Sequence, residues 1–242
     1  MEDHKIPVRT DFRNISMFSL VIGIYLLFLA LMVVSHGYNG SFIYLNSNFY
    51  SWLDLPMFIL THLGDSLILA AIISLALIQK KPHVVLNLII AVTITGILGQ
   101  ILKQVCFEGW DRPLRVFGEN GGIHSLPNYR LFHNSFPSGH SITVTSAFTI
   151  LLLSIQSNKF TQAFYALIVI VVTYSRVYLG AHFPADVLTG AMIGFFMSWL
   201  IFILLNPKTS MLKYSRNFKI IIAVLAIISL IAGIWLLRIY FI

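Results

Sequence analysis

Residues 160–205 read FTQAFYALIVIVVTYSRVYLGAHFPADVLTGAMIGFFMSWLIFILL, and this stretch decides the fold. Two mostly apolar runs, 160–178 and 187–205, flank a short polar turn. A helix that crosses about 30 Å of hydrocarbon needs roughly 20 mostly apolar residues. Each run therefore has the length of one membrane-spanning helix, and the turn reverses the chain at a membrane surface.

The composition of the whole chain agrees with this interpretation. Of its 242 residues, 57% are hydrophobic and only 10% are charged, whereas a soluble domain carries roughly 25% charged residues. These values exclude a water-soluble globule, a disordered chain and a disulfide scaffold, and the single cysteine, Cys106, excludes an intrachain disulfide. The formal charge of +7 comes from few charges in total. We therefore expect basic loops beside a bilayer and no nucleic-acid partner.

Seven membrane spans are predicted along the chain. They cover residues 15–34, 56–78, 84–102, 138–155, 160–178, 187–205 and 220–237. The predicted fold class is all-α, a polytopic transmembrane helix bundle with a six-helix core and a seventh C-terminal helix. The fourth span begins with a polar run, which is costly against lipid unless it faces protein or a wet cavity.

The distribution of lysine and arginine predicts the orientation. With a cytoplasmic N-terminus, most of the 16 lysines and arginines lie on the inner side. The segment 35–55 has neither residue and is rich in aromatic side chains, as a segment at a membrane interface would be. The first span is interpreted as a retained anchor, because it is longer than the apolar core of a signal peptide.

The unusual polar residues of the chain fall at one end of these spans, the outer end in this orientation. They are Lys103, Arg112, Ser138, Gly139, His140, Ser175, Arg176, His182 and Asp186. One such residue would be unremarkable, whereas three cations, two histidines and a carboxylate at one membrane surface indicate a site.

The chemistry that suits this set is phosphoryl transfer. Fixed lysine and arginine side chains hold the non-bridging oxygens of a phosphate through the transition state. A helix that begins at Ser138-Gly139 offers free backbone N–H groups to an anion. One histidine can attack phosphorus and the other can protonate the leaving oxygen. Asp186 follows His182 by four residues, so on a helical turn it lies on the same face and can orient the imidazole.

These residues resemble the signature of the type 2 phosphatidic acid phosphatase superfamily, which includes the vanadium haloperoxidases. The signature reads K-x6-R-P, then P-S-G-H, then S-R-x5-H-x3-D. Residues 137–140 match the second part completely, and residues 175–186 match the third at every specified position. In the first part, eight residues instead of six separate Lys103 from Arg112. The resemblance covers about residues 56–205.

The resemblance implies a role for each matching residue. His182 would be the nucleophile that forms a phosphohistidine, Asp186 its orienting partner and His140 the general acid. The phosphate oxygens would be held by Lys103, Arg112, Ser138, Gly139 and Arg176. The family carries out this reaction without a cofactor or a metal ion.

The predicted function is that of an integral membrane lipid-phosphate phosphatase. It would hydrolyse a phosphomonoester or diphosphate of a lipid headgroup on the outer face, with phosphatidic acid, phosphatidylglycerophosphate, undecaprenyl diphosphate and lipid A as candidate substrates. In a bacterium this would be a cytoplasmic-membrane enzyme that faces the periplasm and has a phosphorylated lipid and membrane lipids as partners. Residues 1–14 would be a cytoplasmic segment, 15–205 the phosphatase domain, and 206–242 a cytoplasmic loop with an additional helix.

Two other classes of function, and one other reaction of the same pocket, stay open. A transporter would carry its ionisable groups near the middle of the bilayer, whereas here they gather at one end. A non-catalytic lipid-binding protein of the same fold would have lost a catalytic residue, yet both motif histidines and the aspartate are present. A haloperoxidase would reuse the same anion pocket for vanadate.

Residues outside the signature have plainer interpretations. Arg115, Arg130 and His133 are expected to be solvated loop residues, with contact to a second phosphate or a sugar headgroup as the alternative. Cys106 gives no indication of reactivity. The isolated histidines are expected to be polar surface; they are His36, His83 and His124. Asp65 is expected to make a polar contact between helices, since a carboxylate inside a span is costly.

Overall fold

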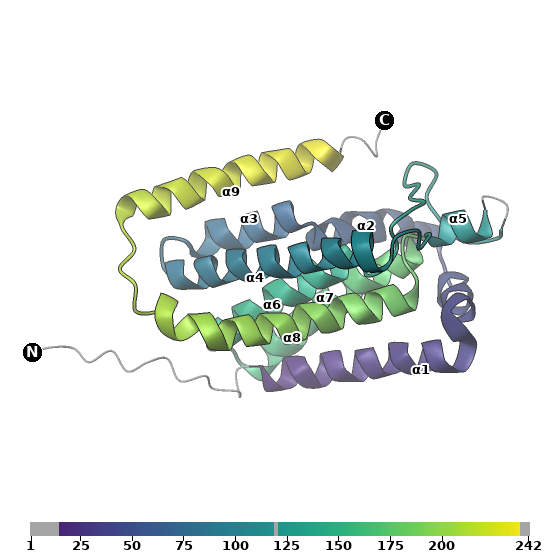
Figure 1. Ribbon diagram of the computed structural model, residues 1–242, viewed down its shortest axis with the longest axis horizontal. Coiled ribbons are helices and arrows are strands. Elements are labelled where there is room, and N and C mark those ends of the chain that lie inside the picture. Colours follow the sequence, from purple (N-terminus) through teal and green to yellow (C-terminus); the bar gives the residue numbers. More distant parts are fainter. Residues whose placement is uncertain (1–14, 119–120, 238–242) are drawn as a thin grey trace, which may run out of the picture.

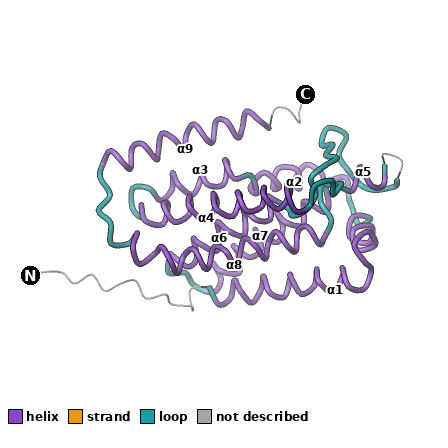
Figure 2. The backbone as a smooth tube through the Cα atoms, viewed as in Figure 1, coloured by secondary structure: helices purple, strands orange, loops and turns teal. Residues whose placement is uncertain are grey.

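The computed structural model describes residues 15–118 and 121–237, and helices are the only regular secondary structure in these residues (Figures 1 and 2). The α-helices are α1 (Ser16–Asn46), α2 (Ser51–Thr61), α3 (Ser66–Leu77), α4 (Pro82–Ile101), α5 (Pro113–Phe117), α6 (Gly139–Ser154), α7 (Lys159–Tyr178), α8 (Pro184–Thr209) and α9 (Arg216–Leu237). The predicted all-α class is confirmed. The predicted segment 1–14 and residues 238–242 lie outside the described residues.

Each predicted span corresponds to helical structure. Within the described residues, five helices are long and apolar enough to cross a membrane: α1, α7, α8, α9 and α4 with the π-helical turn Leu102–Cys106 that extends it. α6 is apolar but has only 16 residues. The prediction of one continuous helix over residues 56–78, the second span, is wrong. α2 and α3 pass the length and hydropathy test only together, and they are bent by 70° at the break between them.

Asp65 makes this break. It follows the 3₁₀ turn His62–Gly64 in an extended conformation, and its Oδ1 accepts the amides of Leu67 (2.8 Å) and Ile68 (3.4 Å). An aspartate in this position satisfies the free N–H groups at a helix start and stabilises the helix by about 1 kcal/mol. The predicted contact between helices is therefore wrong for Asp65, which caps α3.

α6 lies in the centre of the bundle and packs against α4, α7 and α8 (Figure 1). All its residues from Ser141 to Leu153 are buried, so its polar beginning faces protein and not lipid. Glycine makes the approach of α8 possible: a Cβ atom at Gly190 or Gly194 would lie 2.5 Å from a backbone oxygen of Ser138 or Ile142.

α1 continues well beyond the predicted first span. It bends at Gly37, whose φ of 71° and ψ of 178° are not helical, and then runs on to Asn46. Asn46 is buried, and its amide donates to the carbonyl oxygen of Tyr178 (3.0 Å). This second part of α1 packs on the bundle, whereas Tyr50 and Trp52 are exposed. The interfacial position of residues 35–55 stays a prediction.

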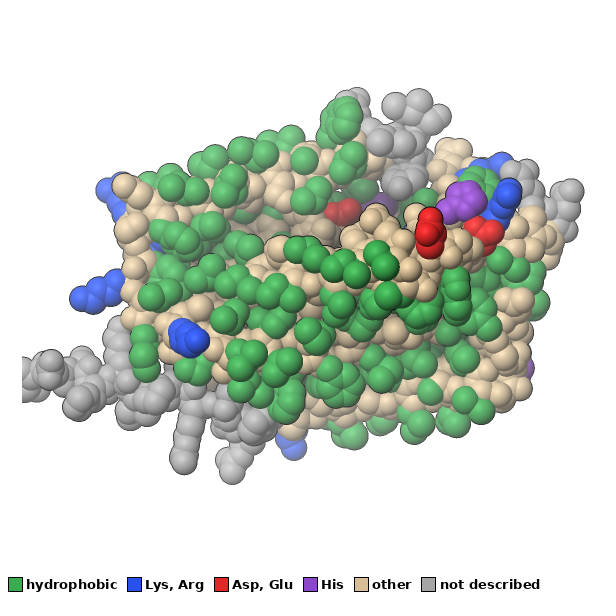
Figure 3. Space-filling view, viewed as in Figure 1, with side chains coloured by type: hydrophobic (Ala, Val, Ile, Leu, Met, Phe, Trp, Pro, Cys, Tyr) green, Lys and Arg blue, Asp and Glu red, His purple; other side chains and the backbone are tan. Residues whose placement is uncertain are grey.

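The two ends of the bundle carry the charged side chains, with a broad apolar surface between them (Figure 3). The connections after α3, α6 and α8 share one end. The described cations in or beside these connections are Lys80, Lys81, Lys159, Lys208, Lys213, Arg216 and Lys219. The α4–α6 connection and the α7–α8 turn share the other end, where the motif residues lie. Which end faces the cytoplasm stays a prediction.

Candidate active site

The turn between α7 and α8 places His182 beside Asp186. α7 ends two residues before Gly180, whose φ of 67° lets the chain reverse. A Cβ atom at Gly180 would lie only 2.8 Å from a carbonyl oxygen of the long loop. A residue with a side chain would therefore clash with this loop, which is a second reason for glycine at this position. After the reversal, the amide of His182 donates to the carbonyl oxygen of Arg176 (3.1 Å). α8 then begins with Asp186 in its first turn, and Nδ1 of His182 lies 3.2 Å from Oδ2 of Asp186.

The Asp186 carboxylate is fully buried and held from three further sides. Its Oδ1 accepts the hydroxyl of Tyr38 (2.5 Å), and its Oδ2 accepts the hydroxyl of Ser135 (2.5 Å) and the amide of Phe183 (3.0 Å). An ionised carboxylate only accepts hydrogen bonds, so His182 donates its Nδ1 proton to it. This assigns the lone pair of the imidazole to Nε2, the nitrogen that does not face Asp186.

The imidazole of His182 is buried as well, with a side chain 2% exposed. Burial lowers the pKa of His182 well below its usual value, and the charges of Arg112, Lys103 and Arg176 lower it further. The ring is therefore neutral at physiological pH, and its Nε2 lone pair is available to an electrophile.

The side chains of Lys103 and Arg112 donate hydrogen bonds to the same backbone oxygen, that of Asn134 in the long loop. Nζ of Lys103 donates to the carbonyl oxygen of Asn134 (3.1 Å), and Nη2 of Arg112 donates to the same oxygen (3.4 Å). Nη1 of Arg112 also donates to the carbonyl oxygen of Ala181, next to His182 (3.3 Å). The structure thus brings Lys103 and Arg112 together although their spacing departs from the signature. Lys103 lies in the π-helical turn Leu102–Cys106, and such turns are frequent at functional sites.

Arg176 reaches the site from the end of α7. Its side chain is buried, and its Nη1 donates to the hydroxyls of Thr61 (2.6 Å) and Tyr129 (2.5 Å). Nε of Arg176 has no hydrogen-bond partner among the residues that the structure describes. Neither Arg176 nor Lys103 forms an ion pair with a described carboxylate. A buried cation without a counter-ion is costly, so this arrangement favours an anionic ligand.

The beginning of α6 closes the site from a third direction. Ser138 is the N-cap residue, and its Oγ accepts the hydroxyl of Ser141 (2.9 Å), while its amide donates to the backbone oxygen of Asp186 (3.0 Å). Gly139 and His140 follow in the first turn, where backbone N–H groups have no partner inside the helix. A Cβ atom at Gly64 would lie 2.8 Å from Cβ of His140, so the break between α2 and α3 also borders this corner.

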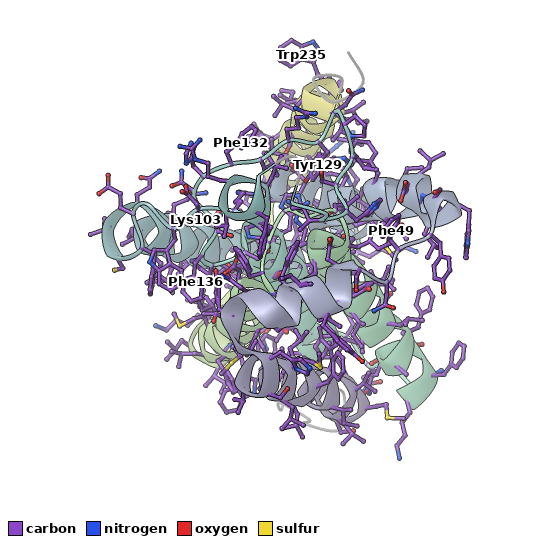
Figure 4. The ribbon with its side chains drawn as sticks, turned by 90° about the vertical axis from the view of Figure 1, so that its right-hand side faces the viewer. Phe49, Lys103, Tyr129, Phe132, Phe136 and Trp235 are labelled. Carbon is purple, nitrogen blue, oxygen red and sulfur yellow. The ribbon has the colours of Figure 1, made fainter. Side chains whose placement is uncertain are left out.

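Four residues of the site were not predicted from the sequence: Tyr38, Thr61, Tyr129 and Ser135. Ser135 lies just before the P-S-G-H motif and could have been suspected from that position. The others come from α1, α2 and the long loop and match no motif. Figure 4 looks onto this end of the bundle, where Tyr129 lies centrally while Trp235 of α9 projects away.

The residues outside the signature divide into two groups. Arg115, Arg130 and His133 are exposed, as expected. Asp111 lies 4.0 Å from Nε of Arg115 and 2.8 Å from Nδ1 of His133. The expectation of polar surface is wrong for His124. Its side chain is only 9% exposed, because the ring stacks on an aromatic side chain and bonds to a carboxylate of α2.

Comparison with known proteins agrees with this geometry. Residues 84–210 match the model of the PAP2 superfamily. An undecaprenyl-diphosphatase of Sulfolobus acidocaldarius is 29% identical over 66% of this chain and 72% of its own length. The crystal structure of Aquifex aeolicus LpxE is similar with a TM-score of 0.60 and 26% identity, covering 67% of this chain and 92% of that one.

A phosphatidylglycerolphosphate phosphatase of the PAP2 type from Bacillus subtilis has the same fold, with a TM-score of 0.58 at 23% identity over 84% of this chain and all of that one. The matched family region spans more than half of the chain and holds both complete motifs, which face each other in the structure. The chain therefore belongs to the PAP2 superfamily.

Proposed function

We propose that this protein is an integral membrane phosphatase that removes phosphate from a lipid headgroup through a phosphohistidine intermediate. The observation that carries the proposal is the pairing of His182 with Asp186 beside Lys103, Arg112 and Arg176. A neutral, oriented imidazole and a cluster of cations are the two things that transfer of a phosphoryl group to nitrogen requires.

The residues have distinct roles in the first half of the reaction. Nε2 of His182 attacks phosphorus, and the bond from phosphorus to the headgroup oxygen breaks as the N–P bond forms. His140 gives a proton to that oxygen, which leaves as an alcohol or a phosphate. The Nδ1 proton of His182 stays on the ring, and the Asp186 carboxylate stabilises the positive charge that develops there.

The second half regenerates the enzyme. Water attacks phosphorus, His140 accepts the proton of that water, and the N–P bond breaks to release inorganic phosphate. Lys103, Arg112, Arg176 and the first amides of α6 hold the oxygens in both halves. In this proposal the side-chain cations supply the charge that a metal ion supplies in other phosphatases. The described residues contain no group of three or more metal-ligating side chains.

The names of the relatives support a lipid substrate. One is called an undecaprenyl-diphosphatase, and the family also includes the phosphatidylglycerolphosphate phosphatase with the same fold. We place the active site on the outer face, which in a bacterium is the periplasmic side of the cytoplasmic membrane, because most lysines and arginines then lie inside.

A phosphate-release assay tests the proposal. Purified protein in detergent, with EDTA present, is given phosphatidic acid, phosphatidylglycerophosphate, undecaprenyl diphosphate and lipid A in turn. We expect release from at least one of them, loss of this activity in His182→Ala, and wild-type activity in His83→Ala at the opposite end of the bundle. Release that is equal in His182→Ala, or that EDTA abolishes, would refute this mechanism.

Trapping the intermediate tests the nucleophile separately. A lipid with a radiolabelled phosphate is mixed with the enzyme and quenched in alkali, which preserves phosphohistidine. Label on the wild-type protein and none on His182→Ala is expected. Label that persists in the variant would assign the nucleophile to another residue.

A further inference from the structure

We propose that α9 forms the outer wall of a groove that holds the hydrocarbon tail of the substrate and limits the tail length that the enzyme accepts. This inference rests on the proposed lipid-phosphatase function. It starts from a cavity of about 790 Å³ between α3, α4, α6 and α9, a volume typical of ligand pockets. Figure 3 shows this face of the molecule hollowed beneath α9.

The groove is continuous with the candidate active site. Its lining includes Lys103, Gly139 and His140, which also belong to the phosphate site, and Gly64 and Asp65 at the break between α2 and α3. A lipid whose phosphate lies at His182 therefore has this groove directly beside its headgroup.

From this mouth the groove runs along the apolar middle of the bundle. Along α4 and the π-helical turn after it, the lining extends from Lys103 back to Ile89, which is about 20 Å at 1.5 Å per residue. On α3 it extends to Ser74, and on α9 to Ile222. Apart from Ser74 and Thr93, the lining away from the mouth is mostly apolar. The groove thus has the direction and the chemistry of an acyl or prenyl tail.

One face of α9 closes the groove. Ile222, Leu225, Ala226 and Ser229 line it, and their spacing of three and four residues places them on a single side of the helix. α9 is held by α3: the hydroxyl of Ser229 donates to a backbone oxygen (3.1 Å), and Gly233 packs so closely that a Cβ atom there would lie 2.6 Å from Ile68. α9 lies outside the residues 84–210 that match the family model.

Tethering explains why the substrate tail occupies the groove. In a bilayer, an apolar groove gains little from burying one hydrocarbon chain in place of another. The tail of a lipid whose phosphate is already bound, however, is present at a high effective concentration. The groove therefore acts as a guide that selects by length and shape, and Ile222 lies at its far end, where only a long tail reaches.

The substitution Ile222→Trp tests this assignment, because it fills the far end of the groove and leaves the mouth unchanged. Ile231→Trp is the matched control, because Ile231 lies on the opposite face of α9 and is 62% exposed. The probes are dihexanoyl and dioleoyl phosphatidic acid, with farnesyl and undecaprenyl diphosphate as a second short and long pair. kcat/KM is measured for each in detergent.

We expect Ile222→Trp to lower kcat/KM at least tenfold for the long-tailed member of a hydrolysed pair and less than twofold for the short one. Ile231→Trp should change neither by more than twofold. Equal losses on short and long tails, or no loss on either, would overturn the groove assignment, and Leu225→Phe repeats the test with a milder change. A wild-type protein that hydrolyses no member of either pair, and no other lipid phosphate, would instead refute the proposed function.

Discussion

The hydrogen bond from Tyr38 to Asp186 gives a sharp test of the site, because no motif contains Tyr38. In the substitution Tyr38→Phe, only the hydroxyl that donates to Oδ1 of Asp186 at 2.5 Å is lost. A hydrogen bond to a charged group contributes about 1.5–3 kcal/mol. A free-energy difference of about 1.4 kcal/mol changes a rate tenfold. If the transition state loses this hydrogen bond completely, kcat/KM should therefore fall by about 10- to 150-fold at most.

Tyr25→Phe is the matched control. Tyr25 also lies on α1 and is buried, but its hydroxyl accepts a bond from the neutral Thr173 (3.1 Å) away from the site. Such a bond contributes only about 0.5–1.5 kcal/mol. We expect both variants to lower the melting temperature in detergent, and only Tyr38→Phe to lower kcat/KM by tenfold or more.

The pH profile separates a role at the site from a role in stability alone. Without the Tyr38 bond the Asp186 carboxylate is less well satisfied and holds a protonated His182 more strongly. This raises the pKa of His182, so the acid limb of kcat/KM should move to higher pH in Tyr38→Phe and stay in place in Tyr25→Phe. A Tyr38→Phe enzyme within twofold of the wild type, with an unshifted acid limb, would refute the reasoning.

Three further predictions concern other parts of the molecule. Because burial and neighbouring cations lower the pKa of His182, the acid limb of the wild-type profile should lie well below pH 6.5, the value of a free histidine; an inflection at or above 6.5 would contradict this. Arg176→Lys should lower kcat/KM at least about 100-fold, since lysine lacks the fork that holds phosphate oxygens, whereas the exposed Arg115→Lys should stay within twofold. Gly194→Ala should destabilise by about 1–3 kcal/mol, because its Cβ would lie 2.5 Å from a backbone oxygen of α6; Gly23→Ala, with nothing within 4 Å, should leave the melting temperature unchanged or raise it.

The sequence predicts the parts of the site that are local in the chain. The geometry of the turn from Arg176 to Asp186 depends on one short segment. This segment contains Gly180, the four-residue spacing between His182 and Asp186, and the start of α8. Lys103 and Arg112 are likewise near each other in sequence. Tyr38 lies 148 residues from its partner Asp186. In sequence it resembles the other aromatic residues of its segment, which are typical of a membrane interface, so its contact with Asp186 could not be predicted.

Hydropathy predicts where helices cross the membrane but not where they break. Residues 56–78 are mostly apolar, and their one carboxylate, Asp65, suits a buried contact as well as a cap. The break depends on backbone geometry and on the need of His140 for space beside Gly64. Hydropathy also does not predict that α1 continues to Asn46. The second part of this helix is stabilised by the hydrogen bonds of Asn46 and by aromatic packing, and these contacts form only in the folded protein.

The cations and the nucleophile of this site depend on each other. In the proposed mechanism Lys103, Arg112 and Arg176 hold the phosphate, and no carboxylate among the described residues forms an ion pair with Lys103 or Arg176. The same positive field, added to burial, keeps His182 neutral. Asp186 has the opposite influence from the Nδ1 side of the ring, where its carboxylate stabilises the positive charge that the ring gains when Nε2 is protonated or, in the proposed reaction, phosphorylated. In the proposed mechanism the unbound enzyme therefore presents cations beside an uncharged nucleophile. A bound phosphate places its negatively charged oxygens against these cations and its phosphorus at Nε2 of His182.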